Sequence, residues 1–289
     1  SLPRSADPMD GLRTVVAARG RYDPEVHDQS PESNLRKATR LVGQFPTIVA
    51  GFHRLRQKRS PVKPRPDRSH AADFLTMLSG TDPAPEHVRA MDVALILQAD
   101  HELNASTFAA RVTAATLSDI YAATTSAIGT LKGPLHGGAN EGVMKLLQEI
   151  GTLDRVEPAV VERLTRKEKI PGFGHRVYRT EDPRARHLRM LAQALGERAG
   201  DLRWFEMTRK IEEVVSREKH LFPNVDLYSA SVYAPMGIPL DLFTPIFAIS
   251  RISGWTAHIL EQYADNRLIR PRAEYTGPLR RDYVPLDLR

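Results

Sequence analysis

Apolar residues recur at helical spacing along almost the whole chain, and this periodicity limits the folds that the sequence can adopt. It predicts helices over residues 35–52, 88–96, 141–150, 160–164, 188–195 and 207–215, with a kink at Pro46 in the first. Strand-like alternation is scarce, and residues 227–233 are the main ambiguous run. We find no internal repeat and no low-complexity tract. The sequence therefore predicts an all-α fold.

The length of 289 residues allows one large domain or two modest ones, and 41% hydrophobic residues can fill a sizeable core. No apolar run approaches the roughly 18 residues that suggest a membrane span. The sequence contains no cysteine, which excludes disulfides, thiolate metal sites and a cysteine nucleophile. No signal or transit peptide is evident, although the first residue is not methionine. We expect a cytoplasmic protein with no membrane partner.

The formal net charge is +6, and the densest basic stretch runs from His53 to Arg68. Such a stretch can attract nucleic acid or anionic substrates. It contains three prolines and no interleaved aromatic residue, so a solvated surface connection is the favoured interpretation. We expect no nucleic-acid partner.

Two histidines and an aspartate stand in distinctive short sequences. His136 lies in Gly-Pro-Leu-His-Gly-Gly, His175 in Gly-Phe-Gly-His-Arg, and Asp226 in Pro-Asn-Val-Asp. The flanking glycines allow backbone to approach a ligand closely. Two imidazoles and a carboxylate form a set of general acids and bases, and the predicted helix ends around them suit anions. The pattern points to proton transfer on a small anionic molecule.

Other motifs that these residues resemble are incomplete. His101-Glu102 begins like a zinc-binding H-E-x-x-H motif, but Ala105 replaces the second histidine. The Gly-x-Gly before His175 lacks the preceding strand of a dinucleotide-binding loop, and there is no G-x-S-x-G motif of a serine hydrolase. Asp226 alone reads more readily as a helix cap than as a base.

Two arginines raise separate expectations. Arg184, in Asp-Pro-Arg, would normally be a solvated turn residue. Arg251 interrupts an apolar run, so its burial requires an anion, either a substrate carboxylate or a structural ion pair.

Taken in their order, these motifs closely resemble the citrate synthase family. The resemblance also includes the His101–Thr107 stretch and, in the C-terminal part, Ser-Arg at 250–251, Asp-Asn-Arg at 265–267 and Arg-Pro at 270–271. It extends from about residue 8 to residue 285.

The resemblance implies a two-domain all-α fold in which a smaller domain closes over the substrates. By this likeness, residues 1–137 and 238–289 form the large domain and residues 138–237 form the small one. Family members are homodimers, or hexamers built from dimers, with active sites shared between subunits. The family pattern also includes a further N-terminal segment, so we expect a trimmed or partial version of a longer protein rather than a short natural variant.

The implied reaction is condensation of acetyl-CoA with oxaloacetate, followed by thioester hydrolysis to citrate and CoA, with no metal or cofactor. By resemblance, Asp226 is the base, His136 stabilises the enol, and His175 protonates the oxaloacetate carbonyl. The residues that match oxaloacetate contacts are His101, Arg184, Arg251 and, from the partner subunit, Arg270; Arg179 matches a CoA contact.

Three alternatives stay open at this stage. 2-Methylcitrate synthesis from propionyl-CoA would use the same catalytic residues, because one extra methylene changes pocket binding by only about 1–3 kcal/mol. A catalytically silent helical binding or regulatory homologue is a second alternative. A basic nucleic-acid-binding helical protein is the third, although no recognised binding motif supports it.

Overall fold

The computed structural model describes residues 2–174 and 180–289, and this part of the chain is helical with no β-strand. The α-helices are α1 (Pro8–Arg19), α2 (Pro31–Arg56), α3 (His70–Ser79), α4 (Pro85–Gln98), α5 (Ala105–Ala114), α6 (Ile120–Leu131), α7 (Ala139–Ile150), α8 (Val156–Thr165), α9 (Pro183–Ala199), α10 (Arg203–Lys219), α11 (Val225–Tyr233) and α12 (Phe243–Ala264). Four 3₁₀ turns accompany them: η1 (Gly20–Tyr22), η2 (Leu153–Arg155), η3 (Leu240–Leu242) and η4 (Leu286–Leu288). The all-α prediction is confirmed.

Each of the six predicted helical runs lies within a longer helix of the structure. Helix α2 continues through Pro46 without ending. The ambiguous run 227–233 is helical, within α11, and all its residues are buried. A segment buried on all sides carries no amphipathic signature, which explains why its periodicity was uninformative.

Short polar side chains fix where many of the helices begin. A side-chain oxygen accepts a hydrogen bond from a backbone N–H of the first turn at Asp7, Ser30, Ser69, Asn104, Asp119, Asp182 and Asn224. These caps satisfy donors that have no partner within the helix. Three of them, Asn104, Asp182 and Asn224, place residues of the site described below.

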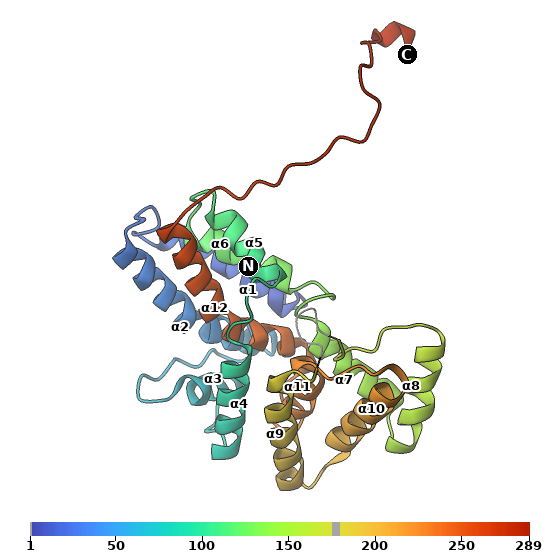
Figure 1. The fold of residues 1–289 in the computed structure, drawn as a ribbon. Helices are drawn as coiled ribbons and strands as arrows, with labels where there is room; N and C mark the ends of the chain where they lie inside the picture. Colours follow the sequence, from blue (N-terminus) through green and yellow to red (C-terminus); the bar gives the residue numbers. More distant parts are fainter. Residues whose placement is uncertain (1, 175–179) are drawn as a thin grey trace.

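The helices pack in two groups, visible in Figure 1. Helix α12 is the centre of one group and contacts α2, α4, α5 and α6. Helices α7 to α11 pack mainly on one another, with α11 held between α7 and α9. The division into domains at residues 138 and 237 stays a prediction.

Helix α12 is apolar around most of its circumference and is buried along most of its length. The fully buried Trp255 packs edge-on against Phe45 of α2, which anchors α12 in the core. Within the part of the chain that the structure describes, no helix has the length and apolar character needed to cross a membrane.

The basic stretch is divided between a helix and a connection. His53, Arg54 and Arg56 belong to the last turns of α2, where cations complement the helix dipole. Residues 57–69 form the predicted irregular connection and are mostly exposed. Arg56 pairs with Asp241 at 2.7 Å and Arg68 with Asp82 at 2.6 Å, so part of the positive charge is neutralised within the chain.

Candidate active site

The ends of α9 and α11, the middle of α12 and the loops before α5 and α7 meet around one small cavity of about 120 Å³. Its lining residues are His101, His136, Arg184, Asn224, Val225, Asp226, Phe247 and Arg251. Five of the residues proposed from sequence, which span positions 101 to 251, are therefore brought together.

Asp226 lies in the first turn of α11, and its helix is capped by Asn224, whose Oδ1 accepts from the Asp226 backbone N–H at 3.0 Å. The interpretation of Asp226 as a helix cap is therefore wrong, because Asn224 is the N-cap residue of α11. The Oδ1 atom of Asp226 is buried and has no hydrogen-bond partner among the described residues. Burial raises the pKa of Asp226 to about 6, opposed by the charges of Arg184 and Arg251. A carboxylate in this state can accept a proton from a bound molecule.

His136 is presented by a tight turn between α6 and α7. The Gly137 N–H donates to the Leu131 carbonyl at 2.9 Å, and a Cβ at Gly137 would lie 2.6 Å from that same oxygen. Only glycine fits this close approach, which accounts for the residue that follows the histidine.

Burial, reinforced by the charge of Arg251, lowers the pKa of His136 to about 4, so the imidazole is neutral near pH 7. Its Nε2 atom lies 3.3 Å from the Ser106 backbone N–H and 2.8 Å from Ser106 Oγ. Since a backbone N–H can only donate, Nε2 is the acceptor and the proton is on Nδ1. The Nδ1–H group is thus available to donate a hydrogen bond to a ligand oxygen.

Arg251 projects from α12 and is only 2% exposed. Its Nε donates to the Gln98 carbonyl at 2.8 Å, and the guanidinium lies 4.7 Å from the ring centre of Phe247. No carboxylate of the described residues is within ion-pair distance of it. Burial, with repulsion from Arg184, lowers its pKa to about 10. The structural ion pair considered from sequence is absent from the described residues, which favours a ligand anion.

Arg184 is not a solvated turn residue. It lies in the first turn of α9 with its side chain 12% exposed, held by Asp182 through Nε–Oδ1 at 3.0 Å and Nη2–Oδ2 at 2.7 Å. This pairing fixes the guanidinium beside the cavity. Together with Arg251 it creates a positive environment suited to a small dianion.

His101 belongs to the loop before α5. Asn104 closes this loop by donating to the His101 carbonyl at 3.2 Å while it caps α5. The loop thereby places His101 on the wall of the cavity.

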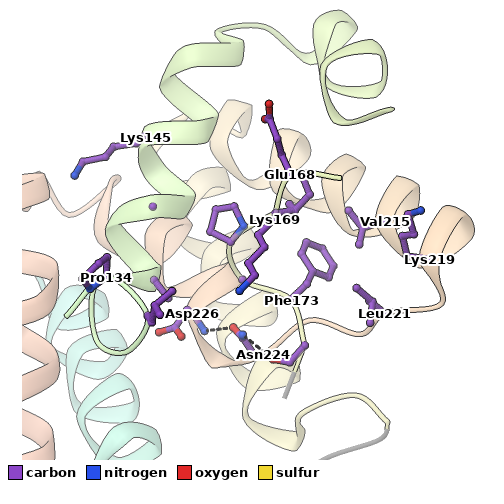
Figure 2. Close-up of a pocket in the computed structure, with 18 of the residues that line it drawn as sticks. Pro134, Lys145, Glu168, Lys169, Phe173, Val215, Lys219, Leu221, Asn224 and Asp226 are labelled. Atoms are coloured by element: carbon purple, nitrogen blue, oxygen red, sulfur yellow. Dashed lines mark hydrogen bonds between the residues drawn. The ribbon is translucent and has the colours of Figure 1, made fainter. Parts of the chain in front are cut away.

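A second cavity, of about 1010 Å³, adjoins the first and shares His136, Asn224 and Asp226 with it. Figure 2 shows Asp226 and Asn224 on one side of it, with Lys145, Lys169 and Lys219 around it. Lys167 and the apolar ring of Phe173 also line it. This cavity can accept a large ligand that carries several negative charges.

The sequence interpretation had not singled out Ser106 or these lysines. Lys167 and Lys169 lie shortly before the Gly-x-Gly at 172–174, a proximity that could have suggested them. Ser106 and Lys219 are brought to the site only by folding.

Three further residues were predicted for the site. His175 and Arg179 lie outside the described residues. Arg270 is exposed on the extended C-terminal segment 265–289, which leaves the body of the molecule in Figure 1.

Comparison with known proteins shows the family to which the chain belongs. Residues 1–272 match the family described as citrate synthase, C-terminal domain. Citrate synthase 2 of Bacillus subtilis is 57% identical over 98% of this chain and 76% of its own length. The citrate/2-methylcitrate synthase of the same organism is 47% identical over 96% of this chain and 75% of its own length.

Among solved structures, the ternary complex of the Thermoplasma acidophilum citrate synthase with carboxymethyl coenzyme A and oxaloacetate is similar, with a TM-score of 0.93 and 36% identity. It covers 100% of this chain, which covers 77% of that one. The chain described here belongs to the citrate synthase family.

Proposed function

We propose that this chain is a citrate synthase, a transferase that condenses acetyl-CoA with oxaloacetate and hydrolyses the resulting thioester to citrate and free CoA. The observation that carries the proposal is the small cavity, which combines an Asp226 carboxylate whose buried Oδ1 has no partner among the described residues, a neutral His136, the buried Arg251 and the partly buried Arg184. Relatives named citrate synthase are 48% to 57% identical to this chain over nearly its whole length.

Oxaloacetate occupies the small cavity in this proposal. Its two carboxylates face Arg184 and Arg251, whose planar guanidinium groups can each donate two hydrogen bonds to a carboxylate. His101 supplies a further contact. Binding a dianion would relieve the unfavourable burial of the Arg251 charge.

Proton removal from the acetyl methyl group is assigned to Asp226. As the methyl proton passes to the carboxylate, charge develops on the thioester oxygen, and the Nδ1–H of His136 stabilises it by donating a hydrogen bond. The resulting carbon nucleophile attacks the keto carbon of oxaloacetate. By family resemblance, His175 protonates the keto oxygen. Water then cleaves the thioester and releases the CoA thiol.

The CoA portion is assigned to the larger cavity, where Lys145, Lys167, Lys169 and Lys219 can meet its phosphates. Arg179 is a further proposed CoA contact. The solved relative from Thermoplasma acidophilum holds both oxaloacetate and a coenzyme A derivative, which supports this pairing of ligands.

Propionyl-CoA is a second candidate substrate, giving 2-methylcitrate. The relative named citrate/2-methylcitrate synthase, at 47% identity, specifically favours this alternative. The chemistry is unchanged, and the added methylene is worth only about 1–3 kcal/mol in an apolar pocket.

We also propose a homodimer, or a hexamer built from dimers, in which Arg270 of one subunit completes the site of its partner. The exposed position of Arg270 on segment 265–289 supports this assignment. A cytoplasmic location and the absence of any metal or cofactor stay predictions.

Oxaloacetate-dependent release of free CoA thiol, with acetyl-CoA and propionyl-CoA side by side, tests the proposal. The chain has no cysteine, so the thiol reagent has no protein background. Acetyl preference would establish citrate synthesis, and propionyl preference would assign methylcitrate synthesis. No release from either thioester, by a folded protein, would contradict the proposal and favour the silent homologue.

A further inference from the structure

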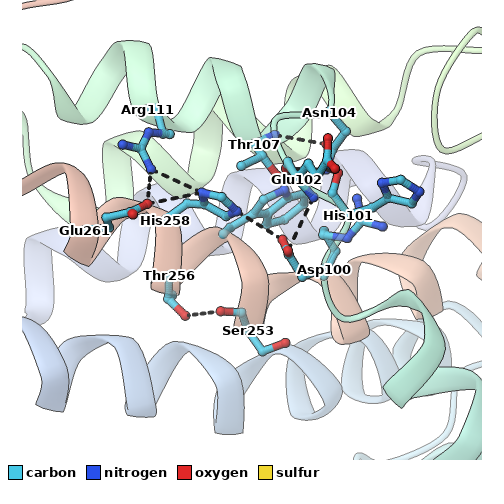
Figure 3. A network of polar contacts seen from close by, with 12 residues as sticks. Asp100, His101, Glu102, Asn104, Thr107, Arg111, Ser253, Thr256, His258 and Glu261 are labelled. Atoms are coloured by element: carbon cyan, nitrogen blue, oxygen red, sulfur yellow. Dashed lines mark hydrogen bonds and ion pairs between the residues drawn. The ribbon is translucent and has the colours of Figure 1, made fainter. Parts of the chain in front are cut away.

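The segment 99–107 connects two histidines of the proposed site, His101 and His136, to helix α12. It contains His101 and it contains Ser106, which hydrogen-bonds His136 Nε2. Figure 3 shows this segment lying along α12, with a polar network between them. The proposed function gives α12 a direct role through Arg251, and the network suggests a second, indirect one.

The Asp100 carboxylate joins α12 to the loop that carries His101. Its Oδ1 is 3.2 Å from His258 Nε2, and its Oδ2 accepts from the Glu102 backbone N–H at 3.3 Å. Glu102 has a φ of 49°, in the left-handed region that is unfavourable for a non-glycine residue. Asp100 therefore holds the sharp turn on the C-terminal side of His101.

Arg111 determines which nitrogen of His258 carries the proton. Its Nη1 lies 3.2 Å from His258 Nδ1, and an arginine can only donate. Nδ1 is therefore the acceptor, which leaves the proton on Nε2, the ring nitrogen that lies 3.2 Å from Asp100 Oδ1. Arg111 is itself fixed by Gln262 at 3.0 Å and by an ion pair with Glu261.

Gly254 allows the segment to lie directly on α12. The Gly254 N–H donates to the Ala99 carbonyl at 3.1 Å. A Cβ at this position would lie 2.4 Å from that oxygen and 2.8 Å from Asp100 Oδ1. The close approach brings His258, one turn later on α12, within reach of Asp100.

The other end of the segment is anchored separately. Trp255 Nε1 donates to Ser106 Oγ at 3.1 Å, and Ser106 in turn contacts His136. The two histidines thus depend on different contacts with the same helix, His101 on the His258–Asp100 pair and His136 on Ser106.

We propose that His258 is a positioning residue for oxaloacetate binding, acting through Asp100 on the loop that carries His101. It does not line the small cavity itself. The inference rests on the proposed function, because it assigns oxaloacetate to the cavity that His101 lines. Loss of the His258–Asp100 contact should loosen the turn at Glu102 and displace His101.

Three variants separate this role from a general loss of stability. His258→Leu keeps side-chain volume but cannot donate, and His258→Gln restores an N–H donor. Ser106→Ala is the contrast, since it changes the support of His136 and leaves the Asp100 contacts intact. Thermal unfolding confirms that each variant is folded before it is assayed.

For His258→Leu we expect the KM for oxaloacetate to rise about tenfold, as befits the loss of a polar contact with a charged group, with kcat changed by less than about twofold. His258→Gln should recover most of the affinity. Ser106→Ala should instead lower kcat. An unchanged oxaloacetate KM in folded His258→Leu would overturn the inference, as would equal losses in the Leu and Gln variants.

Calorimetric titration with oxaloacetate alone distinguishes failure of this inference from failure of the proposed function. The Kd should follow the same order as KM among the variants. If the unmodified chain binds oxaloacetate but releases no CoA thiol, the proposed reaction fails, while a raised Kd in His258→Leu still supports the positioning role. If the unmodified chain binds no oxaloacetate, both are refuted.

Discussion

Replacement of Arg251 by methionine should stabilise the unliganded protein while removing its affinity for oxaloacetate. Arg251 is 2% exposed, and no described carboxylate pairs with it. The fold therefore carries a buried positive charge that, in our account, exists for the substrate. Methionine has similar length and no charge, and its flexible chain can fill the space beside Phe247.

The expected gain follows from the pKa of Arg251, which burial lowers from the ordinary arginine value to about 10. At about 1.4 kcal/mol per pKa unit, this is an unfavourable contribution of roughly 3 kcal/mol. Because the folded pKa of this base is depressed, the penalty is fully present below pH 10 and is relieved only as the pH rises above it.

Arg251→Met also loses the hydrogen bond to Gln98 and the contact with the Phe247 ring. Each loss reduces the expected gain in stability by about 1 kcal/mol. A net stabilisation of about 1 kcal/mol remains, equivalent to a Tm increase of about 2–4 °C.

Thermal unfolding of the unmodified chain, Arg251→Met and Arg251→Lys, with and without oxaloacetate, measures both effects. Arg251→Lys keeps the buried charge and should not be stabilised. Oxaloacetate at a hundred times its Kd should stabilise the unmodified chain by about 2.7 kcal/mol, and it should leave Arg251→Met unaffected. If Arg251→Met lowers the Tm by several degrees, or if oxaloacetate still protects it, Arg251 is a structural residue and the reasoning is refuted.

Asp226→Asn should remain folded, because the raised pKa of Asp226 shows that its buried negative charge is unfavourable. Its turnover should fall roughly 10²–10⁴-fold. Near-normal condensation by this variant would show that Asp226 is not the base. The kcat/KM for acetyl-CoA should fall up to tenfold per pH unit below about pH 6, as the Asp226 carboxylate is protonated, and a pH profile flat from 5 to 8 would contradict this. His136, with its pKa of about 4, stays neutral over that range. Co-expressed Arg270→Ala and Asp226→Asn chains should regain about a quarter of the unmodified activity if random dimers share their sites; confirmed mixed dimers without activity would show self-contained sites.

Helical periodicity predicted the amphipathic helices well, because each has one face in the core and one in solvent. Periodicity could not assign residues 227–233 to a helix or a strand, because burial on all sides removes the alternation of apolar and polar residues. The interpretation of the basic stretch 53–68 as a surface connection was correct from residue 57 on, where three prolines interrupt the chain, but residues 53–56 belong to α2.

The candidate site was only partly accessible from sequence. The buried state of Arg251 followed from its apolar neighbours, since a charge inside such a run must find an anion. The role of Asn224 as the cap of α11 did not, because Asn224 and Asp226 are both plausible caps by type and only the backbone geometry decides between them. Contacts such as Ser106 with His136 or Asp100 with His258 join positions far apart in the chain, so no local sequence pattern predicts them.

Mass spectrometry of the product formed from oxaloacetate and acetyl-CoA with a trideuterated methyl group tests the central claim most directly. If Asp226 removes one methyl deuteron and the remaining carbon attacks the keto group, the product is citrate carrying two deuterium atoms. Trideuterated acetate without citrate would mean that the chain only hydrolyses the thioester, and it would contradict the account of proton abstraction followed by condensation.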